Sequence, residues 1–166
     1  MAAEEQVEPA PLLGTVDPAG RSLHLSTQLA APPVQVWAAL TRPDELAAWL
    51  GRVEHGPDAV GSRFAVEHDE DTRSQHVVTA WQPERLLAMT WVFPAEAESS
   101  VRFTLEAAGE GTRLGVVHEE LADPVAYAAG WHRHLQYLGA HLTGADRPFE
   151  HFWDGYEDLV ERYGAR

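Results

Sequence analysis

Apolar and polar residues alternate along six stretches of the chain, and a period of two is typical of a β-strand with one buried face. In the clearest stretch, Val101, Phe103 and Leu105 alternate with charged and polar residues. Turn-forming sequences such as DEDT, QPER and GEG separate the later stretches, which predicts antiparallel hairpins. The expected strands are residues 21–31, 62–69, 74–81, 86–93, 101–108 and 112–121.

A helical period of apolar residues replaces the alternation in four other stretches. Two short helices are expected directly after the first strand, in PVQVWAAL and TRPDELAAWLG, the first of which starts behind two prolines. A long helix is expected from about 124 to 143, and a short amphipathic helix from about 148 to 163. At about 100° per residue, one stripe of the long helix collects Tyr127, Trp131, Leu135, Leu138 and Leu142.

This order of elements predicts an α+β fold with one antiparallel sheet, since the strands follow one another as a meander. Such a sheet has an apolar face that another layer must cover. The long helix is the one expected element with the length to do so. We therefore predict a twisted antiparallel sheet covered by that helix, in one domain over residues 14–166 that follows a flexible acidic leader at 1–13.

The charge balance narrows the classes of function. The formal net charge is −14, and the chain has neither Lys nor Cys. A nucleic-acid partner needs basic residues to neutralise phosphates, and an anionic membrane surface would repel the chain, so neither is expected. Lysine Schiff-base and thiolate chemistry are excluded. The leader lacks the basic start and apolar segment of a signal peptide, which predicts a cytoplasmic protein.

Three histidines of the long helix raise the question of a metal site. His134 and His141 share one flank of the apolar stripe, but they are seven residues apart, or about 10.5 Å along a helix. One metal ion cannot bridge that distance, so we expect both to be partly exposed residues at the edge of the stripe. His132 lies on the other flank and is expected to hydrogen-bond to a neighbouring element.

Two further histidines lie on the expected hairpin of residues 62–81. Folding it about Thr72 pairs His68 with His76, Val66 with Val78, and Phe64 with Ala80. Opposed imidazoles could share an ion with an acid of the turn, but a solvated hairpin end is the simpler interpretation. We predict no metal and no cofactor.

The alternation of the strands and the stripe of the long helix together predict the inward-facing side chains. His118 alternates with Leu114 and Val116, so we expect it to face inward near the mouth of a cavity, where an imidazole could orient a ligand. Tyr127 and Tyr137 could donate hydroxyls into the same space. The predicted cavity residues are Phe64, Val66, Val78, Met89, Trp91, Phe103, Leu105, Val116, His118, Trp131, Leu135 and Leu138.

Several stretches, in order from about Gly14 to Gly164, resemble a known family. They are APPVQVWAALTRPDELAAWLG, QPERLLAMTW, GEGTRLGVVHEEL, AAGWHRHLQYLGAHLTG and YEDLVERYG. They are similar to the START-like (Bet v allergen-like, or SRPBCC) superfamily, and within it to the proteins like the activator of the heat-shock-protein-ninety ATPase. The resemblance implies a helix-grip fold, in which an apolar ligand is held between the sheet and the long helix.

The leading hypothesis is therefore a module that binds a small, largely apolar molecule, with no catalytic residue predicted. One alternative is a cyclase, hydratase or hydrolase that uses His118 in the cavity. Another, implied by the resemblance, is an interaction protein with a chaperone partner. The aromatic residues of the tail, Phe149, Phe152 and Trp153, are candidates for a homodimer contact, unless they pack onto their own domain.

Overall fold

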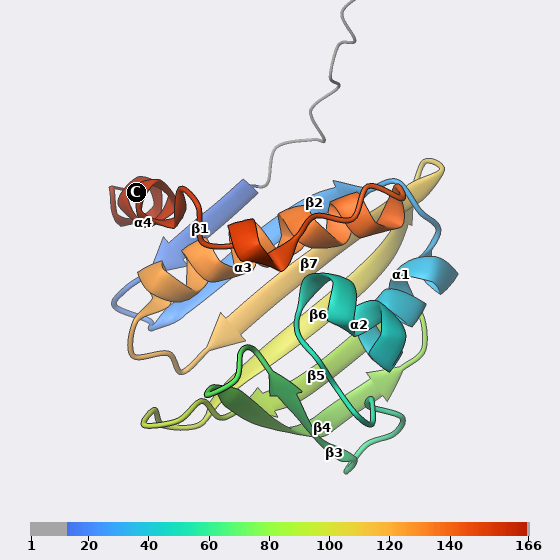
Figure 1. The fold of residues 1–166 in the computed structure, drawn as a ribbon, viewed down its shortest axis with the longest axis horizontal. Helices are drawn as coiled ribbons and strands as arrows, with labels where there is room; N and C mark the ends of the chain where they lie inside the picture. Colours follow the sequence, from blue (N-terminus) through green and yellow to red (C-terminus); the bar gives the residue numbers. More distant parts are fainter. Residues whose placement is uncertain (1–12, 166) are drawn as a thin grey trace, which may run out of the picture.

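A computed structural model describes residues 13–165, in which a curved antiparallel sheet is covered on one face by helices (Figure 1). The strands are β1 (Leu13–Asp17), β2 (Ser22–Leu29), β3 (Arg63–Glu67), β4 (Arg73–Gln82), β5 (Leu86–Trp91), β6 (Ser99–Ala108) and β7 (Gly111–Glu119). The helices are α1 (Pro33–Thr41), α2 (Pro43–Trp49), α3 (Pro124–Leu142), the 3-10 turn η1 (Phe149–His151) and α4 (Tyr156–Gly164). This is the predicted α+β helix-grip architecture.

The sheet has seven strands in the order β1-β2-β7-β6-β5-β4-β3. Strand β2 therefore pairs with the last strand, β7, and β1 lies at the edge beside β2. The alternation that predicted the strands is also the burial pattern: Val101, Phe103 and Leu105 are buried and their neighbours on β6 face outward. Strand β1 was not predicted. It begins at Leu13, inside the stretch predicted as a leader, and the rest of that leader, residues 1–12, lies outside the described residues.

The predicted register of the β3–β4 hairpin is wrong. Phe64 pairs with His76 and Val66 pairs with Ser74, so His68 does not oppose His76. The turn is centred on residue 70 and not on Thr72, because the backbone N–H of His68 bonds to the carbonyl of Thr72 at 2.9 Å. The slip is an even number of residues, and an even slip leaves every side chain on its predicted face.

Helix α3 covers the concave face of the sheet. The Asp123 side chain caps its start by accepting from the backbone N–H of Ala126 at 3.1 Å, and Pro124 occupies the first turn. Of the predicted stripe, Trp131, Leu135 and Leu138 are buried against the sheet, while Tyr127 and Leu142 at the two ends are partly buried. The apolar stripe thus faces the sheet as its spacing predicted.

The tail folds back onto α3 as two short elements, η1 and α4, rather than as one helix over 148–163. Arg133 of α3 donates from Nη1 to the carbonyls of Phe152 and Asp154 at 2.6 and 2.7 Å. His132 Nδ1 and the Tyr163 hydroxyl lie 2.7 Å apart, which confirms the expected bond from His132 to a neighbouring element. These contacts fix α4 beside α3 and β1 (Figure 1).

Two glycines should respond to alanine in opposite directions. A Cβ at Gly111, at the start of β7, would overlap the backbone carbonyl oxygen of Leu29, whereas a Cβ at Gly130 in α3 meets no atom within 4 Å. We expect Gly130→Ala to stabilise the fold by about 0.5–1 kcal/mol through helix propensity. Gly111→Ala should destabilise it by about 1–3 kcal/mol. Urea unfolding of both variants checks this, and equal effects would contradict the packing described.

His141 joins three parts of the fold. Its Nδ1 lies 2.9 Å from Asp146 and its Nε2 lies 3.2 Å from Glu45 of α2. Partial burial tends to lower the pKa of His141, but the two carboxylates outweigh it and raise the pKa above its ordinary value. A group whose pKa is raised on folding stabilises the folded state at pH values below its unfolded-state pKa. That stabilisation is lost as the pH rises through the folded-state pKa.

We therefore expect His141→Gln to destabilise the protein more at pH 5.5 than at pH 9. The difference should be below about 1 kcal/mol, because the Asp146 carboxylate is largely solvated and the site lies at the surface. Urea unfolding at the two pH values measures it. His24→Gln, on the outer face of β2, is the matched control, and a larger loss at pH 9 would be opposite to the expected sign.

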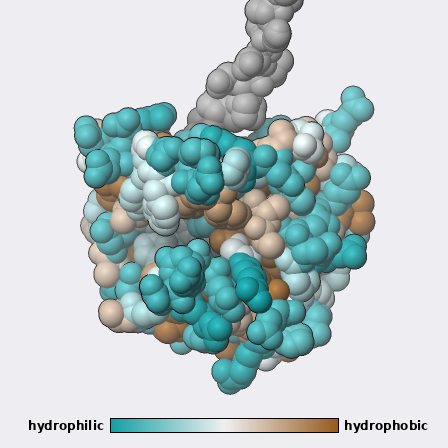
Figure 2. All heavy atoms as spheres, viewed as in Figure 1, coloured by the Kyte–Doolittle hydropathy of each residue, from teal (hydrophilic) through white to brown (hydrophobic). Residues whose placement is uncertain are grey.

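Figure 2 shows mostly hydrophilic residues over the helical face, with a smaller group of hydrophobic residues near its centre. Among residues 13–165, none of the helices has both the length and the apolar character that a bilayer crossing requires.

Candidate functional site

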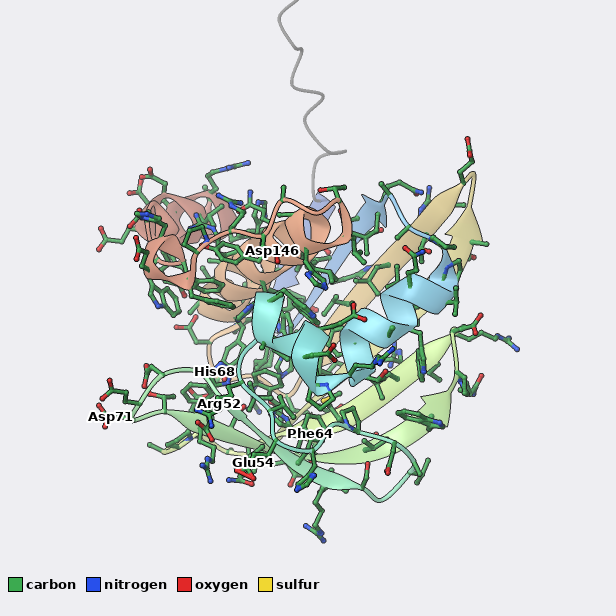
Figure 3. All side chains as sticks on the ribbon, turned by 45° about the vertical axis from the view of Figure 1, so that its right-hand side comes forward. Arg52, Glu54, Phe64, His68, Asp71 and Asp146 are labelled. Atoms are coloured by element: carbon green, nitrogen blue, oxygen red, sulfur yellow. The ribbon has the colours of Figure 1, made fainter. Side chains whose placement is uncertain are left out.

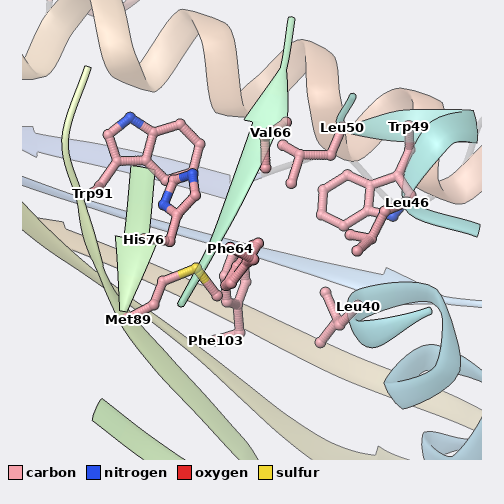
Figure 4. Close-up of a pocket in the computed structure, with 10 residues that line it drawn as sticks. All are labelled: Leu40, Leu46, Trp49, Leu50, Phe64, Val66, His76, Met89, Trp91 and Phe103. Atoms are coloured by element: carbon pink, nitrogen blue, oxygen red, sulfur yellow. The ribbon is translucent and has the colours of Figure 1, made fainter. Parts of the chain in front are cut away.

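A small cavity lies between the sheet and the two short helices (Figure 4). Its volume is about 10 Å³, which is room for about one water molecule. The wall is aliphatic and aromatic apart from one imidazole, that of His76. The lining residues are Leu40, Leu46, Trp49, Leu50, Phe64, Val66, His76, Met89, Trp91 and Phe103.

The cavity brings together part of the predicted set. Phe64, Val66, Met89, Trp91 and Phe103 line it. The remaining predicted residues are buried in the same core without lining it, and they are Val78, Leu105, Val116, His118, Trp131, Leu135 and Leu138.

Five of the ten lining residues were not predicted from the sequence. Four of these residues come from α1 and α2 or directly after them: Leu40, Leu46, Trp49 and Leu50. Their helices were predicted, but local spacing does not say which part of the sheet a helix covers. The fifth is His76, whose signal was available, because it alternates with Val78 on the inward face of β4.

Four histidines surround a central pair of tryptophans next to this cavity. The rings of Trp91 and Trp131 meet edge to face with centroids 5.3 Å apart. His76 lies 4.5 Å from Trp91, and His134 lies 5.6 Å from Trp131. His68 and His118 complete the group at 6.0 and 5.8 Å from Trp91. We call these six side chains the imidazole–indole cluster.

The first polar chain of the cluster runs from His68 to β5, and its proton positions follow from the partners. His76 Nδ1 lies 3.0 Å from the carbonyl oxygen of Thr90, which can only accept, so His76 Nδ1 carries a proton. In the neutral ring, His76 Nε2 must then accept from the Ser74 hydroxyl at 2.7 Å. Ser74 has no second proton, so it accepts from His68 Nε2 at 2.8 Å. His68 Nδ1 is left as an unprotonated acceptor.

The second chain is fixed by an indole. Trp131 Nε1 donates to His118 Nδ1 at 3.0 Å, so the proton of neutral His118 is on Nε2. That proton faces Ser99 Oγ at 2.8 Å, and Ser99 donates in turn to the carbonyl of Trp91 at 3.2 Å. His118 is inward-facing as predicted, but it is fully buried, and both of its nitrogens are engaged. It cannot accept the Ser99 proton, which argues against a serine–histidine nucleophile here.

The fourth histidine bonds to the backbone of α2. His134 Nδ1 lies 2.8 Å from the carbonyl oxygen of Trp49 and must donate to it, which leaves Nε2 unprotonated. Like His141, His134 keeps part of its surface exposed, as expected from its place on the flank of the stripe, but its ring packs against Trp131 and Phe152.

Burial keeps all four imidazoles neutral. It lowers the pKa of His68 and of His76 to about 4, and the pKa of His118 and of His134 to about 3. A charged imidazole in this interior would lose its hydration, and the charge of Asp69, which favours protonated His68, does not outweigh that loss. Clusters of titratable groups with strongly shifted pKa values beside a cavity are typical of functional sites, although structural hydrogen-bond networks can also produce such shifts.

Trp91 carries the one polar side-chain atom that is buried without a hydrogen bond among residues 13–165, its Nε1. Figure 4 shows this nitrogen turned away from the other labelled side chains. The Tyr127 hydroxyl is nearby, although no hydrogen bond joins the two groups, and it donates instead to Glu96 at 2.7 Å. Burial, reinforced by Glu96, raises the pKa of Tyr127, so its hydroxyl keeps its proton as a donor.

Within the described residues, histidines and acids form no group of three that could hold a metal ion. The turn acids Asp69, Glu70 and Asp71 are exposed, and Figure 3 shows Asp71 at the outer tip of the hairpin, away from His68. His68 and His76 meet through Ser74 rather than through a shared ion.

Known proteins of this architecture span nearly the whole chain. CalU16 from Micromonospora echinospora is 24% identical with a TM-score of 0.76, over 93% of this chain and 95% of that chain. The protein encoded by BPP1335 of Bordetella parapertussis is 30% identical with a TM-score of 0.74, over 95% and 91%. EF2215 from Enterococcus faecalis, a conserved protein of unknown function, is 20% identical with a TM-score of 0.66, over 92% and 91%.

No curated protein matches the chain. The family described as activator of Hsp90 ATPase homolog 1-like protein matches residues 30–143, from just before α1 to just after α3. That stretch contains every lining residue of the cavity and the whole imidazole–indole cluster. Together with the helix-grip fold, this match shows that the chain belongs to the activator of Hsp90 ATPase homolog 1-like family of the SRPBCC superfamily.

Proposed function

We propose that the protein binds a small, largely apolar molecule between the sheet and helices α1 to α3. The observation that carries the proposal is that an apolar cavity adjoins the imidazole–indole cluster. Burying imidazoles costs stability, and aliphatic side chains would fill the same space at no such cost. Apolar walls with a few placed polar groups are characteristic of small-molecule sites.

Binding must widen the cavity, since about 10 Å³ is far below the several hundred Å³ of ordinary ligand sites. The wall is suited to this. Met89 has an unbranched side chain that can adopt other rotamers. Leu46 and Trp49 belong to α2, a helix of seven residues, which can move with less disruption than a central strand. We propose that α2 moves away from β3 when the ligand enters.

Titration of the isotopically labelled protein with p-xylene tests the proposal. The six tryptophans give six indole N–H signals that separate interior from surface. We expect saturable shifts for Trp49 and Trp91, which line the cavity, and none for Trp153, which is 64% exposed. Native mass spectrometry of the purified protein would search for the natural ligand.

A matched pair of variants on β5 locates the binding. Met89→Ala enlarges this cavity and should tighten p-xylene binding, whereas Leu87→Ala, on the same face of the strand but outside the lining, should not. Shifts confined to Trp153, or a tightening with Leu87→Ala alone, would refute interior binding at this site.

A second candidate, protein interaction through the tail, is favoured by the exposure of Phe149 and Trp153, at 39% and 64%. Phe152, by contrast, is 3% exposed and packs onto its own domain. If the tail holds a second copy of the chain, sedimentation velocity should detect a dimer that Trp153→Ala abolishes. A monomer at all concentrations would reject the homodimer and leave a different partner, such as a chaperone, to be tested.

A further inference from the structure

His68 and His134 present unused hydrogen-bond acceptors on neighbouring rings. Each ring is held by a proton given to a protein oxygen, that of Ser74 for His68 and that of Trp49 for His134. The opposite nitrogens, His68 Nδ1 and His134 Nε2, are therefore unprotonated and accept no hydrogen bond from the described part of the chain. Neither is sealed from solvent, because Trp91 Nε1 is the one buried polar side-chain atom there without a partner. Both rings are neutral at pH 7, because burial lowers their pKa to about 4 and about 3.

The two rings come from distant parts of the chain, the end of β3 and the middle of α3, yet their centroids are 6.5 Å apart. A ring nitrogen lies about 1 Å from its centroid, and a hydrogen bond adds about 2.9 Å, so one small polar group can reach both rings. The pair adjoins the cavity through two wall residues: His68 touches Trp91, and His134 bonds to Trp49. Figure 3 shows His68 on the inner side of the hairpin.

We infer that the ligand carries a hydroxyl group, which donates a hydrogen bond to one of His68 Nδ1 and His134 Nε2, or an amino group, which can donate to both, and that its remaining part is apolar. This inference rests on the proposed function and names the ligand class for the same site. A hydrocarbon that covers either acceptor would displace water without replacing its hydrogen bond, and a group that only accepts would place lone pairs against lone pairs. An alcohol, phenol or amine fits, whereas a ketone, an ether or a carboxylate does not.

Three probes of nearly equal size test the inference on the wild-type protein: p-cresol, which donates, 4-methylanisole, which only accepts, and p-xylene, which does neither. A purely apolar site prefers p-xylene, because the hydroxyl of p-cresol gives up its bonds to water. We expect p-cresol to bind at least about fivefold more tightly than either of the others, the ratio that one net hydrogen bond supplies. The ¹⁵N resonance of at least one of His68 Nδ1 and His134 Nε2 should shift on binding of p-cresol, and neither should shift on binding of p-xylene.

Variants supply the second test. At least one of His68→Phe and His134→Phe should reduce the ratio of p-cresol affinity to p-xylene affinity towards one, while His24→Phe on the outer face of β2 keeps it. If the two interior variants do not fold, the ¹⁵N measurement on the wild type still decides.

The outcomes separate the two proposals. Binding of none of the three probes would overturn the proposed function. Equal binding of all three, or equal binding of p-cresol and 4-methylanisole, would keep interior binding and overturn the inference that the ligand is a donor. A p-cresol preference without a shift of either ring-nitrogen resonance would also overturn it.

Discussion

Lowering the pH from 7 to 5 is expected to remove several kcal/mol from the free energy of unfolding. In the unfolded chain a histidine titrates near 6.5, whereas burial lowers the folded-state pKa of His76 to about 4 and that of His118 to about 3. The unfolded chain therefore takes up protons first as the pH falls. The contribution of these residues to the free energy of unfolding is fully present above the unfolded-state pKa. It is lost as the pH falls towards the folded-state pKa values. Each of these two residues contributes about 2 kcal/mol of the loss by pH 5.

His68 and His134 act in the same direction, since burial lowers their pKa as well, while the raised pKa of His141 opposes them. Urea unfolding at intervals between pH 4.5 and 8 measures the slope of the free energy of unfolding against pH. One bound proton corresponds to about 1.4 kcal/mol per pH unit, so the slope near pH 5.5 should exceed that value clearly.

His118→Gln should lower that slope by about one proton, whereas His24→Gln on the outer face of β2 should leave it unchanged. A stability that is flat from pH 8 to 5 would mean that the four imidazoles are not neutral in the folded protein, and the assigned proton positions would then be wrong.

Trp131→Ala should be among the most damaging single substitutions in the chain. Trp131 is 2% exposed and touches both Trp91 and Phe103 at the centre of the core. We expect a loss of about 3–5 kcal/mol from the lost burial and the void left behind. The lost indole N–H adds to this, because His118 Nδ1 would remain buried without a donor.

Two further variants separate the contribution of the hydrogen bond from that of apolar burial. Trp131→Phe keeps most of the apolar area and removes the N–H, so it isolates the hydrogen bond to His118. That bond favours neutral His118, so the pKa of His118 should rise above about 3 in this variant, as measured by NMR titration. Trp153→Ala is the exposed control, with an expected change within about 0.5 kcal/mol. Similar losses for Trp131→Ala and Trp153→Ala would contradict the packing described.

The sequence predicted the faces of the elements better than their relations to one another. Alternation placed Phe103 and His118 inward, and helical spacing placed Trp131 against the sheet, because both depend on residues close in the chain. Pairing depends on the loop, and the acidic turn of residues 69–72 could be closed in more than one register. The five residues of β1 gave too short a pattern to recognise.

The candidate site was predictable only in part, for the same reason. The inward residues of the strands were identified, but whether they line a void depends on side chains from other elements, here Leu46, Trp49 and Leu50 from α2 and the residue after it. The tautomers of His68 and His134 follow from Ser74 and from a backbone carbonyl of α2, and neither partner could be recognised from the sequence around the two histidines.

The pairing of β2 with β7 has a consequence for how the chain folds. Leu25 and Val116 are neighbours in the sheet, although 90 residues separate them in the chain. During translation β2 therefore leaves the ribosome long before its partner exists, and its inner face must wait for β7. Closing so long a loop carries an entropic cost and slows folding. The hairpins from β3 to β7 can form first, and docking of the N-terminal strands should be the late step.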